Sequence, residues 1–291
     1  MKTVRTLMLA VTLLLWAGVA CGQTWTQTSA PTNNWRGIAL SADGMRIIAL
    51  NCIEGQGGPL ASNNPVYIST DSGVDWGPAS AAQWYEWDGY LGYDGGFADA
   101  WEFLTCSADG KKLVVTSEAA SSPLWFSRNF ATTWFYGGPT TTWGTSQTCV
   151  GGLVTCSSAD GNKIFAEAGA FYASFDSGTT WTNPPSPAEL DCIATSADGT
   201  KLVAGTIYYD GLYLSTNSGL SWSATAPQNL QWGAVASSAD GSKKVAAVYA
   251  SSVLYSNSTW FNIGGPIYVS ADSGATWAPT TAPMANWQSV A

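Results

Sequence analysis

Aromatic and acidic side chains alternate along one segment of the chain, residues 83–102 (QWYEWDGYLGYDGGFADAWE). Aromatic rings stack against the C–H face of a sugar, and carboxylates accept hydrogen bonds from its hydroxyl groups. A pair of carboxylates can also supply the acid and the base of glycoside hydrolysis. The predicted ligand-binding residues are Trp84, Tyr85, Trp87, Asp88, Tyr90, Tyr93, Asp94 and Asp99. The alternative is a long loop whose aromatic residues form a small core of their own.

The composition excludes several classes of chemistry. The 291-residue chain has no histidine, which removes Ser-His-Asp and Cys-His catalysis and histidine-ligated zinc. With 11 basic and 20 acidic residues the formal charge is −9, and an acidic chain repels a phosphate backbone. We therefore expect no nucleic-acid partner, no metal and no cofactor.

The first 22 residues have the layout of a secretory signal peptide. Lys2 and Arg5 precede an apolar run over residues 7–16, and small residues follow at 17–20. The run is too short for a transmembrane anchor, so we expect a secreted or cell-surface protein, extracellular or periplasmic, with no transmembrane segment. Cys21 stands where a bacterial lipoprotein carries its lipid, and lipid anchoring is the less favoured alternative.

Five further cysteines are scattered without metal-binding spacing, namely Cys52, Cys106, Cys149, Cys156 and Cys192. Cys149 and Cys156 could close a small disulfide loop after export, and the pairing is otherwise open. Cys106, Cys156 and Cys192 lie in apolar, strand-like segments. We expect these three to be buried free thiols.

Two short motifs alternate along the chain. The first motif, Ser-Ala-Asp-Gly, occurs five times and ends at Gly44, Gly110, Gly161, Gly199 and Gly241. A basic residue and an apolar run follow each copy. The Asp-Gly pair favours a tight turn, because glycine readily takes a positive φ, and the apolar flanks favour strands. The first motif therefore predicts five β-hairpins.

The second motif ends in tryptophan and occurs at residues 69–76 (STDSGVDW), 174–181, 215–222 and 270–277, with a degraded copy at 127–134 (SRNFATTW). It resembles the Asp-box of bacterial neuraminidase-type repeats. The resemblance implies a structural hairpin on a propeller blade, with structural roles for Asp71, Asn129, Asp176, Asn217 and Asp272. A short side-chain oxygen can accept the N–H groups of its own turn. A calcium site is the alternative, disfavoured because each turn offers one carboxylate.

The alternating motifs predict an all-β fold, a β-propeller of four-stranded antiparallel blades. We expect residues 23–291 to form one domain, with five complete blades at about 35–82, 101–142, 152–187, 190–227 and 232–282. The termini add incomplete strands: Trp25 resembles the end of a second motif, and residues 287–291 resemble the start of an inner strand. Either five blades close the ring, or the chain is a piece of a longer propeller.

Insertions gather on one side of this fold. In a four-stranded blade, the loop between the second and third strands and the loop to the next blade share one face, while both motifs lie on the other. Residues 83–102 form the largest insertion, and residues 255–266 and the loop around Trp143 accompany it. We expect a ligand on this face.

The resemblance raises the expectation of sialidase or polysaccharide-hydrolase activity, and each of these enzymes has features that can be looked for in this sequence. Sialidases of this kind use three arginines and an Arg-Ile-Pro motif, but residues 23–291 contain only Arg36, Arg46 and Arg128 and no such motif. Xyloglucan-hydrolysing enzymes also resemble this chain in their repeats, but they combine two propellers. Our leading hypothesis is a non-catalytic propeller that binds a glycan or a protein. A glycoside hydrolase is the alternative, and an extracellular scaffold or assembly protein, as among sortilin-like propellers, the third.

Overall fold

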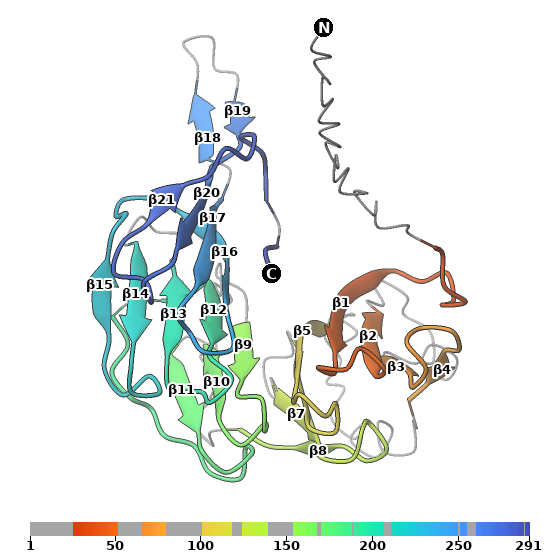
Figure 1. Ribbon diagram of the computed structural model, residues 1–291. Coiled ribbons are helices and arrows are strands. Elements are labelled where there is room, and N and C mark those ends of the chain that lie inside the picture. Colours follow the sequence, from red (N-terminus) through yellow and green to blue (C-terminus); the bar gives the residue numbers. More distant parts are fainter. Residues whose placement is uncertain are drawn as a thin grey trace, which may run out of the picture.

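The computed structural model describes residues 26–51, 66–79, 101–117, 124–138, 154–167, 170–187, 189–206, 211–249, 251–254, 260–287 and 289–291. All regular elements in these ranges are strands, and the ranges contain no helix. The strands form a series of antiparallel sheets in which chain neighbours pair, as expected for propeller blades (Figure 1). The prediction of an all-β propeller is therefore confirmed.

Each blade is a meander that runs from an inner strand outward. The first blade consists of β1 (Trp35–Leu40), β2 (Ile47–Asn51), β3 (Val66–Ser69) and β4 (Gly77–Pro78). The second consists of β5 (Trp101–Cys106), β6 (Leu113–Ser117), β7 (Leu124–Ser127) and β8 (Phe135–Tyr136). The fourth consists of β12 (Cys192–Thr195), β13 (Leu202–Gly205), β14 (Leu212–Ser215) and β15 (Ser223–Thr225).

The third blade departs from the expected four strands. It contains β9 (Val154–Ser157), β10 (Ile164–Glu167) and β11 (Phe171–Ser174), and its outer strand is reduced to one bridge between Ala173 and Thr182. Pro184 and Pro185 follow soon after this bridge. Proline has no N–H group to donate to a neighbouring strand, so pairing stops there.

The fifth blade carries an additional hairpin that the sequence analysis did not predict. Its sheet contains β16 (Trp232–Ser237), β17 (Lys244–Val248), β20 (Ile267–Ser270) and β21 (Ala278–Pro279). Between β17 and β20, β18 (Ser251–Leu254) and β19 (Trp260–Ile263) pair with each other and project from the blade (Figure 1). The hairpin accounts for part of the predicted insertion at 255–266.

The blades follow one another along an arc. The inner strands β1, β5, β9, β12 and β16 are neighbours in chain order, while the first and fifth blades lie apart at its two ends (Figure 1). The sequence left open whether the five blades close a ring by themselves. They do not close a ring in this structure.

The first motif forms the turn between the inner strand and the second strand of each blade. In the fourth blade, the Ser196 hydroxyl donates to the Asp198 carboxylate over 2.6 Å, and the Thr200 N–H donates to the same oxygen over 2.9 Å. Gly199 has a φ of 67°, as the Asp-Gly turn requires.

The second motif forms the turn between the third and outer strands. In the third blade, Gly178 N–H donates to the Ser174 hydroxyl over 2.9 Å, and Trp181 Nε1–H donates to the Gly178 carbonyl over 3.2 Å. Both Ser177 (φ 59°) and Gly178 (φ 83°) are left-handed. The degraded copy has the same backbone, with positive φ at Phe130 and Ala131, so it folds as a true copy.

Both motifs lie on the same face of the molecule, as predicted. A backbone N–H in each second motif donates to the carbonyl of a residue just after the first motif of its own blade. These bonds join Ser72 to Met45, Phe130 to Lys111, Ser177 to Asn162, Ser218 to Thr200 and Ser273 to Ser242. We call this side the turn face. The opposite side, where the chain passes between second and third strands and between blades, is the loop face.

A belt of backbone hydrogen bonds links the blades at the turn face. The alanine N–H of each first motif donates to the alanine carbonyl of the next copy. The four bonds run from Ala42 to Ala108 (2.7 Å), Ala108 to Ala159 (2.6 Å), Ala159 to Ala197 (2.7 Å) and Ala197 to Ala239 (2.7 Å). Because adjacent copies are joined by the same bond, the belt fixes the spacing between blades.

In the first four blades, the basic residue after the first motif reaches the next blade. Lys201 Nζ donates to the Asp240 carbonyl over 2.9 Å, and a Cβ at Gly241 would lie 2.7 Å from Lys201 Cδ. The same relation holds for Arg46 over Gly110, Lys112 over Gly161 and Lys163 over Gly199. The glycine therefore has two roles. It takes the positive φ of its own turn, and its lack of a side chain leaves room for the basic residue of the preceding blade.

Apolar side chains fill the space between adjacent blades, which is where the core lies. Between the fourth and fifth blades, Val203 and Leu212 pack with Trp232, and all three are fully buried. Between the second and third blades, Phe126 packs with Ile164 and Ala166. Alternate residues of a strand therefore serve two different interfaces.

We predict that Gly178→Ala destabilises the protein far more than Gly44→Ala. At Gly178 a methyl group would lie 2.7 Å from the buried Phe126 ring, whereas at Gly44 it would meet no atom within 4 Å. Both substitutions carry the left-handed backbone cost of about 1 to 2 kcal/mol, and only Gly178→Ala adds about 1 to 3 kcal/mol of overpacking. Urea unfolding measures the difference, and equal losses would contradict the inter-blade contact.

Candidate functional site

The candidate ligand-binding residues lie outside the described residues. These are Trp84, Tyr85, Trp87, Asp88, Tyr90, Tyr93, Asp94 and Asp99, all between β4 and β5. The end of β4 and the start of β5 bound this segment, and both open onto the loop face. The prediction that these residues bind a ligand therefore remains a prediction.

The acceptor residues of the second motif are engaged in their own turns. Asp176 accepts hydrogen bonds from the Thr180 N–H over 2.8 Å, the Thr180 hydroxyl over 2.6 Å and the Ser174 hydroxyl over 2.9 Å. Asp71 and Asp272 accept the same backbone bond, from the N–H groups of Asp75 and Thr276. These contacts hold the carboxylates on the turn face, away from the loop face.

The two asparagine copies show why an amide can replace the carboxylate. Asn217 Oδ1 accepts the Ser221 N–H over 2.9 Å, while its Nδ2 donates to the Ser221 hydroxyl over 2.8 Å. Asn129 makes the matching pair of contacts with Thr133. The hydroxyl side chain reverses its role from donor to acceptor, so the turn keeps both bonds without a charge.

Two arginines of the described part also serve blade contacts. Arg46 donates to the Asp109 carbonyl over 2.9 Å and lies over the Phe130 ring at 5.1 Å. Arg128 donates to the Ser177 carbonyl over 3.2 Å and lies over the Phe135 ring at 4.7 Å. Each arginine donates to a backbone carbonyl on the turn face of the next blade, and Arg128 also lies over a ring of its own blade. Neither side chain is therefore placed to bind a substrate on the loop face.

The cysteines within the described part are free thiols, as expected. Cys156 and Cys192 are buried and Cys106 is half-buried. Burial raises the pKa of Cys106 to about 11 and that of Cys192 to about 12, and it also raises the pKa of Cys156. A thiol that keeps its proton is a poor nucleophile and metal ligand. Cys52 and Cys149 lie outside the described residues.

An acidic cluster on the loop face, which the sequence analysis missed, consists of Glu167, Glu189 and Asp191. Glu167 is the last residue of β10, and Asp191 directly precedes β12, so both lie at strand ends opposite the turns. The Asp191 N–H donates to the Gly205 carbonyl over 2.9 Å, which fixes the start of the fourth blade. The cluster therefore lies between the third and fourth blades.

Glu167 is the unusual member of this cluster. It shares one face of β10 with Phe165 and points toward the fourth blade, where only 3% of it is exposed. Its Oε2 atom is buried without a hydrogen-bond partner. Burial, reinforced by the charges of Glu189 and Asp191, raises the pKa of Glu167 to about 8. The carboxyl group therefore keeps its proton at neutral pH.

The repeat itself contains the signal that could have revealed Glu167. Counted from the first motif, the same position holds Leu50 in the first blade, Thr116 in the second, Gly205 in the fourth and Ala247 in the fifth. A glutamate in such a series is costly, because burying a carboxyl group without full hydrogen bonding carries a penalty. A protonated carboxyl beside other carboxylates can act as a hydrogen-bond donor or a general acid.

No metal site or membrane span accompanies the cluster in the described part of the chain. Within those ranges, no group of three or more histidine, cysteine, aspartate or glutamate side chains is placed to hold a metal ion. The same ranges contain no helix long and apolar enough to cross a membrane.

Comparison with known proteins places the fold but no family. No family model matches the chain, and no curated protein matches it. Among solved structures, a GH74 enzyme from Niastella koreensis superposes with a TM-score of 0.56 at 18% identity, over 86% of this chain and 32% of the enzyme. A GH74 xyloglucanase from Xanthomonas campestris gives 0.57 at 12% identity, over 90% and 34%.

A third similar structure is matched along most of its length. YCF48 from Cyanidioschyzon merolae superposes with a TM-score of 0.50 at 13% identity, over 89% of this chain and 88% of YCF48. This chain spans about a third of the length of the two GH74 enzymes. At these identities the likeness is one of fold, and the chain has the β-propeller fold of these proteins.

We predict that Asp176→Ala lowers stability by about 1 to 2 kcal/mol, because the turn loses its acceptor. Asp176→Asn is the matched control and costs less, since Asn217 keeps both bonds to a hydroxyl residue. The turn holds the pKa of Asp176 at about 2, below its usual value. Its contribution is thus complete above about pH 4 and is lost as pH falls toward 2. Chemical unfolding at pH 7 and pH 3 tests both statements, and equal stability of the alanine and wild-type proteins would contradict them.

We also predict that Glu167→Gln raises stability near neutral pH. The native state keeps the Glu167 proton up to a pKa of about 8, whereas the unfolded chain releases it near 4.5, so wild-type stability falls as pH rises between these values. The effect is on the order of a few kcal/mol. No histidine titrates in this window. Urea unfolding from pH 5 to 8 should show a slope in the wild type that the variant lacks, and parallel profiles would refute the assignment.

Proposed function

We propose that this chain is a secreted, non-catalytic β-propeller that binds a glycan through its loop face. One observation carries the proposal. The carboxylates of both motifs are committed to hydrogen bonds on the turn face, whereas the half-buried Glu189 and Asp191 lie at the loop face beside the buried Glu167. Half-buried carboxyl groups can accept hydrogen bonds from the hydroxyl groups of a sugar.

The proposal extends to residues 83–102, which leave and re-enter the described part at the same face. Their aromatic and acidic side chains complement the polar cluster with stacking surfaces. One structural neighbour is named as a xyloglucanase, which supports a polysaccharide as the ligand class. The five turns with a shared hydrogen-bond pattern support our inference that the second motif is an Asp-box of the neuraminidase type.

A glycoside hydrolase is the second candidate. The raised pKa of Glu167 makes this residue a proton donor of the kind that such chemistry requires, and Glu189 and Asp191 are further carboxyl groups beside it. Two of the structural neighbours are GH74 enzymes, which supports this alternative.

A glycan array combined with a hydrolysis screen on polysaccharides separates the two candidates. Under our proposal a glycan binds and is not cleaved. Replacing Trp84 and Trp87 with alanine together should weaken binding about 5- to 150-fold, from the loss of two stacking rings. The melting temperature should not change. Asp176→Ala is the control, with lower stability and unchanged binding.

Three outcomes would contradict the proposal. Cleavage of a polysaccharide that Glu167→Gln abolishes and Asp75→Asn leaves intact would establish the hydrolase, since Asp75 is an exposed carboxylate on the turn face. Unchanged glycan binding by the double tryptophan variant would remove the insertion from the site. Unfolding of that variant would show that the tryptophans form a local core.

A further inference from the structure

Within the arc, each blade face that points along the chain is covered by the neighbouring blade. The upstream face of the first blade and the downstream face of the fifth blade have no such neighbour. The upstream face of the first blade comprises Trp35, Ile38, Ala49, Tyr67 and Trp76. Strand register places Ile38, Ala49 and Tyr67 in one row across β1, β2 and β3, on the side away from the second blade. Ile38 is 62% exposed and Trp35 is 37% exposed.

The upstream face of the first blade has the same residue types as the face that the fifth blade packs against the fourth. The matching pairs are Trp35 with Trp232, Ile38 with Val235, Ala49 with Ala246, Tyr67 with Tyr268 and Trp76 with Trp277. The geometry also matches: Trp35 meets Tyr67 edge-on with ring centres 5.3 Å apart, and Trp232 meets Tyr268 in the same way at 5.6 Å. Trp232 is fully buried because the fourth blade covers it.

The downstream face of the fifth blade is the complementary half. Register places Ala236, Val245 and Val269 in one row across β16, β17 and β20. The corresponding row of the fourth blade is Ala194, Val203 and Leu214, and it packs against the fifth blade. Leu214 lies over Gly274, whereas Val269 is 42% exposed.

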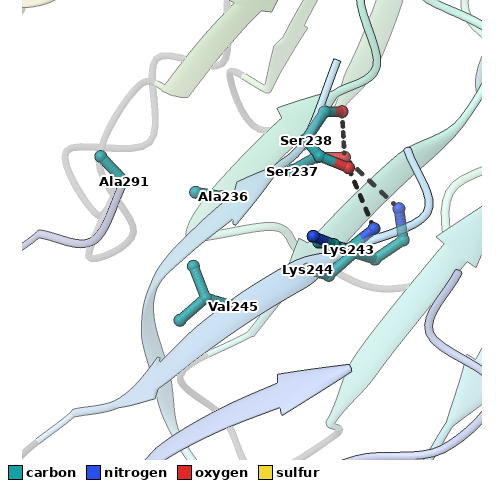
Figure 2. Close-up of a pocket in the computed structure, with 7 residues that line it drawn as sticks. All are labelled: Ala236, Ser237, Ser238, Lys243, Lys244, Val245 and Ala291. Atoms are coloured by element: carbon teal, nitrogen blue, oxygen red, sulfur yellow. Dashed lines mark hydrogen bonds between the residues drawn. The ribbon is translucent and has the colours of Figure 1, made fainter. Parts of the chain in front are cut away.

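The hydrogen-bond belt is also incomplete at these two faces. Within the described residues, the Ala239 N–H has no partner alanine carbonyl, and the Ala42 carbonyl accepts no alanine N–H. At the fifth blade a cavity of about 230 Å³ opens, lined by Lys243, Val245 and Ser238, the residue that precedes Ala239 (Figure 2). Lys243 has the place in the repeat that Lys201 has where it contacts Asp240 and Gly241.

We propose that the first blade of a second copy of this chain docks on the fifth blade, as the fifth docks on the fourth. The contact continues an interface that the chain already makes four times, with an alanine belt bond and a basic side chain over an Asp-Gly turn. It also repeats the Trp-Tyr pair that the fifth blade packs against the fourth. Within one copy, the two faces lie at opposite ends of the arc, so they do not meet (Figure 1). Ala291 is exposed at the edge of the cavity, and the docking blade displaces it.

The expected association is head-to-tail, because two different faces meet. We expect the full chain to show concentration-dependent mass in sedimentation or light scattering, at twice the monomer mass or more. Ile38→Asp and Val269→Asp each place a charge in one half of the interface and should give monomers. Mixing these two variants should restore a dimer, since each retains the face that the other has lost. Leu220→Asp, on an exposed turn of the fourth blade, is the control and should associate as the wild type does.

Four results would overturn the proposal. The first is a wild-type chain that stays monomeric at all concentrations, which needs no variant to interpret. The second is a monomer that both aspartate substitutions destabilise, which would indicate closure of the ring within one chain. The third is wild-type association of either folded single variant. The fourth is a mixture of the two folded variants that remains monomeric.

Discussion

The backbone bond between successive first motifs is the constraint on which the structure depends. It joins Ala42, Ala108, Ala159, Ala197 and Ala239 in chain order at 2.6 to 2.7 Å. With the turns fixed at this spacing, the basic side chain of one blade reaches the Asp-Gly turn of the next, and the apolar rows meet behind it. The same spacing determines which residues meet at the loop face. Glu167 and Asp191 come from different blades, and they lie together because the belt and the apolar layer hold those blades side by side.

Much of the fold could be predicted because it repeats. The turns of the first motif and of the second motif each have a local hydrogen-bond pattern that their own residues specify. Because each motif occurs five times, the sequence predicts the blades and the face on which both motifs lie. The missing outer strand of the third blade could also have been read from Pro184 and Pro185, which cannot donate to a strand. The open arc could not, because the angle between blades is set by tertiary contacts.

The candidate site was harder to predict than the fold. Sequence reasoning looks for clusters of chemically active residues along the chain, and it therefore found residues 83–102. Glu167 and Asp191 are 24 positions apart and come together only because adjacent blades face each other. The effect on proton affinity is likewise tertiary, since burial between two blades raises the pKa of Glu167. What the sequence does contain is a departure from its own repeat, a glutamate where other blades have Leu50, Thr116, Gly205 and Ala247.

In four of the five second-motif turns, a serine rather than a glycine is left-handed, namely Ser72, Ser177, Ser218 and Ser273. An L-residue in this conformation carries a modest energetic cost, which the surrounding hydrogen bonds must offset. The free energy of forming such a turn is therefore less favourable in an isolated hairpin than within a folded blade. It follows that an isolated peptide of this motif should populate the turn less than the same residues do within their blade.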